Sequence, residues 1–99
     1  MDHLEQARRL LRLLQESSPS EATAYADDLL LFLQRLNDRF LFFAPRISYA
    51  STYGPSLIRS WTDRIESDPE RALLDDAFRT SVIGFLDDLC CGRVPVRPR

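Results

Sequence analysis

The chain of 99 residues has 13 basic side chains, all of them arginine, 15 acidic ones and a single histidine, so its net charge is near −2. This length allows one domain and excludes a two-domain enzyme with a cleft between its halves. The slight acidity also disfavours a general nucleic-acid binder, which needs a clear basic excess.

The first predicted helix covers residues 3–16. Asp2 stands three residues before Glu5, the spacing at which both side chains can satisfy unpaired amide protons of a helix start. Apolar residues then recur at helical spacing and define a face directed at a core. These residues are Leu4, Ala7, Leu11 and Leu14.

The second predicted helix covers residues 19–43 and has the clearest start, with Ser18 as N-cap, Pro19 in the first turn and Glu21 as the third helical residue. Its apolar seam consists of Ala22, Ala26, Leu29, Leu33, Leu36, Phe40 and Phe43. Further apolar side chains lie off this seam, namely Leu30, Leu31, Phe32, Leu41 and Phe42. Such a helix is typical of the centre of a fold, or of one that also meets a partner.

Pro45 ends this helix, and we predict an ordered loop over residues 46–54. A third helix is expected over 55–66. A fourth is expected over 69–91, capped by Ser67 or Asp68 and stopped by Gly92.

Two acidic residues, Asp87 and Asp88, close the fourth helix, where carboxylates oppose the helix dipole unless they are paired. We expect an arginine from the tail or from a neighbouring helix to pair with them. Residues 93–99 contain arginine and proline without an apolar pattern, and they predict a flexible basic tail.

These elements predict an all-α protein with a single helical domain over residues 1–92. The expected architecture is a four-helix, mostly antiparallel bundle with the second helix at its centre and the fourth beside it.

Tyr25-Ala26-Asp27-Asp28 resembles the metal-binding motif of reverse transcriptases. That resemblance implies two Mg²⁺ ions held by aspartates on a β-hairpin for phosphoryl transfer. The same residues, with Leu29, also resemble a BH3-like ligand helix. Because the segment follows a strong helix start and lies in a helical seam, the favoured interpretation is a solvated acidic patch near a helix N-terminus.

The sequence lacks the residues or the spacing that a di-metal site, a zinc site or a disulfide would need. His3 is the only histidine and has no glutamate at the spacing of a di-metal site. Cys90 and Cys91 are adjacent, which suits neither a zinc site nor a normal disulfide. We expect no enzymatic activity, metal or cofactor, and the unpaired thiols favour a cytoplasmic protein. No apolar run approaches the roughly 20 residues of a membrane span.

The expected function is therefore that of a protein–protein interaction module, such as an adaptor, a regulatory subunit or a chaperone-like protein, that self-associates as a homodimer. The candidate surface lies at the end of the second helix and in the loop after it. It consists of Phe40, Leu41, Phe42, Phe43, Ile47, Tyr49 and Tyr53.

Two alternatives remain open at this stage. One is a Mg²⁺-dependent nucleotidyl or phosphoryl enzyme that uses Asp27 and Asp28. The other is a nucleic-acid-binding regulator that uses the arginines of the first helix, Arg8, Arg9 and Arg12, and whose binding weakens with salt.

Overall fold

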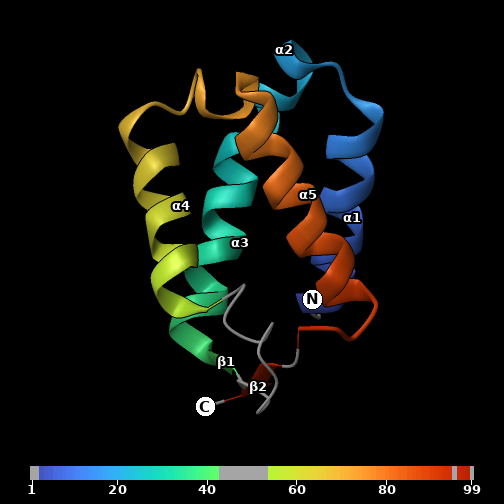
Figure 1. Ribbon diagram of the computed structural model, residues 1–99, viewed down its shortest axis with the longest axis vertical. Helices are drawn as coiled ribbons and strands as arrows, with labels where there is room; N and C mark the ends of the chain where they lie inside the picture. The colour runs from blue at the N-terminus through green and yellow to red at the C-terminus, as the bar shows by residue number, and fades with distance from the viewer. Residues whose placement is uncertain (1–2, 43–53, 95, 99) are drawn as a thin grey trace.

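The computed structural model describes residues 3–42, 54–94 and 96–98, most of which are helical, so the protein is all-α. In chain order the elements are α1 (His3–Glu16), α2 (Pro19–Ala22), the 3-10 turn η1 (Thr23–Tyr25), α3 (Ala26–Arg39), β1 (Phe40–Phe42), α4 (Pro55–Ser67), the 3-10 turn η3 (Ala72–Leu74), α5 (Asp76–Cys90) and β2 (Val96–Pro98). Figure 1 shows the four long helices side by side, with α2 at one end and the strands at the other.

The start of α2 follows the predicted pattern. The Ser18 hydroxyl accepts a hydrogen bond from the backbone N–H of Glu21 at 3.3 Å and donates one to the Glu21 carboxylate at 2.9 Å. Pro19 occupies the first turn, where no helical donor is lost.

The prediction of one continuous helix over residues 19–43 is wrong in two places. The helix first tightens into η1, where the Thr23 hydroxyl donates to the Ser20 carbonyl at 2.7 Å and Tyr25 leaves helical geometry with φ −100° and ψ 6°. It then ends at Arg39, because Phe40 is extended, with φ −124° and ψ 146°. Aromatic residues fit a paired strand well, and here β2 supplies the pairing that the sequence pattern did not reveal.

The predicted start of the last helix at residue 69 is also wrong. The chain turns after α4, buries Ala72 and Leu73 in η3, and enters α5 at Asp76. Neither Ser67 nor Asp68 caps α5. Asp75 does, because its carboxylate accepts the backbone N–H groups of Ala77 and Phe78.

The end of α5 is a glycine stop, as predicted. Gly92 has φ 76°, a conformation that favours glycine. The Gly92 N–H donates to the Leu89 carbonyl at 3.2 Å and the Arg93 N–H to the Asp88 carbonyl at 2.8 Å, which is the Schellman pattern. The Arg93 guanidinium also lies 2.8 Å from the Asp88 carboxylate and 3.9 Å from that of Asp87, so an arginine after the helix does pair with them.

The segment after Gly92 is not a free tail in its described part. Val94 is buried, and β2 pairs antiparallel with β1. In this register Phe40 lies opposite Pro98 and Phe42 opposite Val96. At residues 96–98 the C-terminal segment thus pairs with the strand that follows α3, a contact that the predicted flexible tail over 93–99 did not include.

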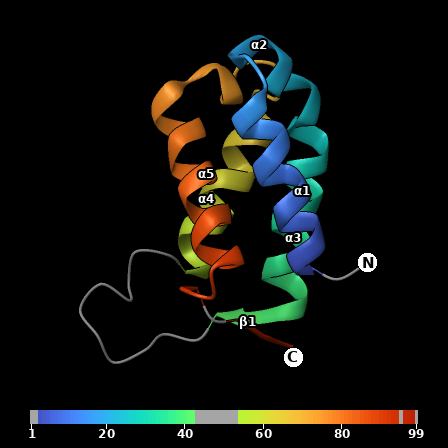
Figure 2. The same ribbon diagram turned by 90° about the vertical axis from the view of Figure 1, so that its right-hand side faces the viewer.

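Packing of the long helices places α1 against both α3 and α5, and α4 against α3 (Figures 1 and 2). Aromatic side chains connect α4 to α5: the Trp61 ring lies edge-on to those of Phe78 and Phe85, with centroid distances of 6.2 and 5.6 Å. The largest fully buried side chains are Phe85, Leu14, Leu29, Leu33, Leu36, Ile58, Ile65, Leu73, Leu86, Leu89 and Val82.

Candidate functional site

The surface predicted around residues 40–53 is described only at its beginning. Phe40 is half-buried, packs against the core and has its ring 4.4 Å from that of His3. Leu41 and Phe42 lie in β1, where they pair with β2. Outside the described residues lie Phe43, Ile47, Tyr49 and Tyr53. Part of the Phe40 side chain is therefore covered by contacts within the fold and is not exposed to a partner.

The Tyr25–Asp28 segment is helical. Tyr25 ends η1, and Asp27 and Asp28 are exposed in the first turn of α3, where the helix dipole favours negative charge. A hairpin with a third carboxylate would be needed to hold two Mg²⁺ ions. Within residues 3–42, 54–94 and 96–98, no group of three or more His, Cys, Asp or Glu side chains is placed to hold a metal ion.

The adjacent cysteines differ in their surroundings. Cys90 packs partly against the core, and this burial raises the pKa of its thiol, an effect that the positive charge of Arg8 partly opposes. Cys91 is exposed, with its sulfur 4.0 Å from an Asp87 carboxylate oxygen. A raised pKa leaves less thiolate for nucleophilic chemistry, so Cys90 fits an apolar packing role.

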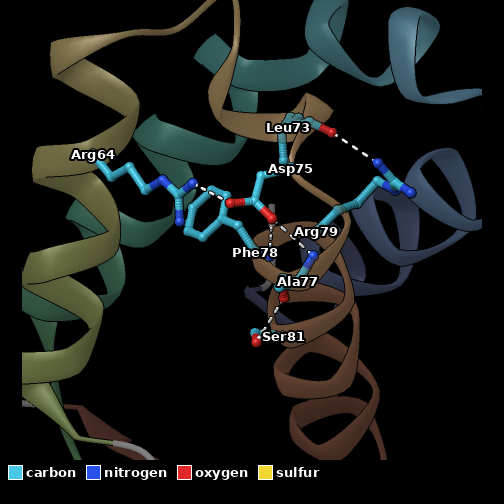
Figure 3. A network of polar contacts seen from close by, with 7 residues as sticks. All are labelled: Arg64, Leu73, Asp75, Ala77, Phe78, Arg79 and Ser81. Atoms are coloured by element: carbon cyan, nitrogen blue, oxygen red, sulfur yellow. Dashed lines mark hydrogen bonds and ion pairs between the residues drawn. The ribbon is translucent and has the colours of Figure 1, made fainter.

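A polar network joins the end of α4 to the start of α5 (Figure 3). The Arg64 guanidinium pairs with the Asp75 carboxylate and lies over the Phe78 ring, 4.7 Å from its centroid. Arg79 donates to the Leu73 carbonyl at 3.0 Å and pairs with Asp76. The hydrogen bond from Arg64, together with those from the cap amides, holds the pKa of Asp75 below its ordinary value.

This network should make stability depend on pH in one direction. A carboxyl group whose folded pKa is lowered stabilises the fold above its unfolded pKa, and the contribution is lost as the pH falls through the folded pKa. Asp75→Asn keeps a capping oxygen but not the charge that faces Arg64. We expect this variant to be less stable than the wild type at pH 7, with the gap closing as the pH falls below about 4.

Urea unfolding at several pH values measures this gap. Asp63→Asn is the matched control, because Asp63 is an exposed aspartate whose side chain makes no ion pair among the described residues. An Asp75→Asn gap that stayed constant from pH 7 to the acid range would contradict the role of the Arg64 pair.

The face shared by α1 and α3 contains two shallow hollows, of about 80 and about 100 Å³. Gln6, Phe32 and Arg35 line both hollows, which are therefore neighbours on one face and are together named the α1–α3 groove. Arg9, Asp28 and Leu31 border its first part, and Arg39 and Phe40 its second. The helices α1 and α3 are in contact, and in Figure 2 α1 lies in front of α3. Sites for small molecules are typically several times larger, so this groove suits protruding side chains.

The charge of the groove is mainly positive. Arg9, Arg35 and Arg39 are exposed and make no ion pair in the described part of the chain. Asp28 is the only carboxylate among the described residues that line the groove. Leu31, 47% exposed, adds an apolar centre on α3. The groove thus offers guanidinium groups around an apolar contact, which can bind a carboxylate beside an aliphatic side chain.

Sequence reasoning identified only part of this groove. Arg9 belonged to the predicted basic face of the first helix, but Arg8 lies on the side of α5, near Cys90. Arg35 and Arg39 were not singled out, although their spacing of four residues on one helix places them on one face.

No protein-family model, curated protein or solved structure matches this chain. Among the described residues, no helix combines the length and the apolar character needed to cross a membrane.

Proposed function

We propose that this protein is a non-enzymatic protein-interaction module that binds through the α1–α3 groove and associates with itself. The observation that carries the proposal is the half-exposed Leu31 beside arginines that have no ion pair in the described part of the chain. Arginine side chains are enriched among the residues that anchor protein interfaces, and an exposed apolar side chain beside them is stabilised when a partner covers it.

The module that presents this face is proposed to be an antiparallel four-helix bundle. Its support is the packing of α1 on α3 and α5 and of α4 on α3, together with the short connections from α1 to α3 and from α4 to α5. Short connections favour antiparallel neighbours. In such a bundle α3 occupies a corner, so its outer face remains available to a partner.

Sedimentation equilibrium of the purified chain tests this function. We expect a monomer–dimer equilibrium in the micromolar range, because one helix face buries less area than the interface of a stable dimer. The dimer should weaken as the salt concentration rises, since its charged groups are at the surface. A monomer that persists to high micromolar concentration at low salt would contradict self-association.

A second candidate is the binding of a polyanion such as a nucleic acid, which Arg9, Arg35 and Arg39 favour through their position along one groove. Asp28 in the same groove and the net charge near −2 weigh against it. Titration with a labelled RNA or DNA oligonucleotide separates the two functions. Binding to nucleic acid should fall steeply as salt increases, and its affinity should not depend on the oligomeric state of the protein.

A further inference from the structure

The exposed face of α3 has a charge pattern that is complementary to itself. Asp28, Leu31 and Arg35 are all exposed, and their spacing of three and four residues places them on one face of the helix. Asp28 and Arg35 are about 10 Å apart along the helix axis, and Leu31 lies near the midpoint between them. A negative charge, an apolar centre and a positive charge therefore follow one another along this face.

We infer that a second copy of this chain docks antiparallel on α3, with a two-fold axis near Leu31. This inference rests on the proposed self-association and names its contact. The symmetry places Asp28 of each copy opposite Arg35 of the other and brings the two Leu31 side chains together. A two-fold contact uses the same patch on both copies, so each favourable pair occurs twice.

The groove strengthens this pairing. Arg9 and Arg35 line the same hollow as the Asp28 of their own copy, so an Asp28 carboxylate of the second copy seated beside Arg35 meets two guanidinium groups and one carboxylate in that hollow. Neither arginine has an ion pair to give up in the described part of the chain.

The remaining side chains of this face do not oppose the contact. Asp38 lies in the last turn of α3 and Ala24 in η1 before its first turn, and both are exposed. In the register that places Asp28 opposite Arg35, Asp38 of one copy lies opposite Tyr25 of the other and Arg39 lies opposite Ala24, so a neutral residue faces each of these charges. Asp27, beside Asp28, also faces the half of the partner helix that contains Arg35. No like charges then lie directly opposite each other along α3.

Charge reversal gives a test that only a contact between copies can pass. In Asp28→Arg two arginines face each other twice in the dimer, and in Arg35→Asp two aspartates do so. Each variant alone should raise the dissociation constant about tenfold or more. An equal mixture of the two variants restores opposite charges at both pairs, so the heterodimer should return to within about twofold of the wild-type constant.

The matched control is a mixture of Glu70→Arg and Arg71→Asp, which change the charge by the same amounts at exposed residues in the turn after α4. Each of these should dimerise like the wild type, alone and mixed. Circular dichroism checks that every variant keeps the helix content of the wild type. If a reversal unfolds the chain, Asp28→Asn removes the same ion pair with less disturbance and should still weaken the dimer.

The outcomes separate this contact from the general function. If the wild type dimerises and the Asp28→Arg and Arg35→Asp variants dimerise equally well, the α3 contact is overturned and self-association stays in place. Loss of the dimer in both variants without recovery in the mixture would also overturn it. A wild-type chain that stays monomeric would overturn the proposed self-association together with this contact.

Discussion

Replacing Phe85 with alanine is expected to lower the free energy of unfolding by about 3–5 kcal/mol. Phe85 is fully buried on α5, and its ring lies edge-on to Trp61 of α4 at 5.6 Å. Truncation removes this aromatic contact and leaves a cavity where α4 and α5 meet. Small domains have only about 5–15 kcal/mol in total, so the variant should be close to unfolding at room temperature.

Urea unfolding monitored by circular dichroism and by the fluorescence of Trp61, the single tryptophan of the chain, measures the loss. Both signals should change together if α4 and α5 unfold as one unit. Leu74→Ala is the control, because Leu74 is 45% exposed, and it should shift the stability by no more than about 0.5 kcal/mol. A Phe85→Ala loss of similar size to the control would mean that Phe85 does not bridge the two helices.

The helices could be predicted where their signals are local. Ser18, Pro19 and Glu21 begin a helix because their side chains and backbone act within one turn. Gly92 ends one because its own φ value is positive. Asp88 and Arg93 are only five positions apart, and their pairing agrees with the expectation that an arginine from the tail or from a neighbouring helix would pair with the acidic end of this helix.

The strand pair could not be predicted, because its two halves come from opposite ends of the chain. Residues 40–42 continue an apolar seam of helical period, and nothing near them shows that residues 96–98 will pair with them. The predicted start of α5 was wrong for a related reason. Proline and serine near residue 69 resemble a helix start, but the burial of Leu73 against other elements moves the cap to Asp75.

The candidate site could be predicted from the sequence only in part. Apolar residues off the seam of the second predicted helix indicated either a central position or a partner, and the structure divides them: Phe32 is buried and Leu31 is half-exposed. The sequence could not show that Arg9 lines the same hollow as Arg35, because this depends on the packing of α1 against α3. A periodic pattern can identify the face of a helix, but the neighbour of that face depends on tertiary packing.

Two leucines on α3 allow stability and association to be measured separately. Leu33 is fully buried and Leu31 is 47% exposed, two positions away on the same helix. Leu33→Ala should lower the free energy of unfolding by about 2–5 kcal/mol through lost burial and a cavity. Leu31→Ala should change it by no more than about 0.5 kcal/mol in dilute solution, where the chain is monomeric.

For the dissociation constant of the dimer we expect the opposite order, with the larger effect from Leu31→Ala and the smaller one from Leu33→Ala. Leu31→Ala removes the apolar centre of the proposed α3 contact and should raise the dissociation constant, whereas the fraction of Leu33→Ala that remains folded keeps that surface. Urea unfolding at low concentration and sedimentation at high concentration measure the two quantities on the same samples. A dimer that tolerated Leu31→Ala would place the interface elsewhere on the molecule, and a stability that tolerated Leu33→Ala would contradict the packing of α3 in the core.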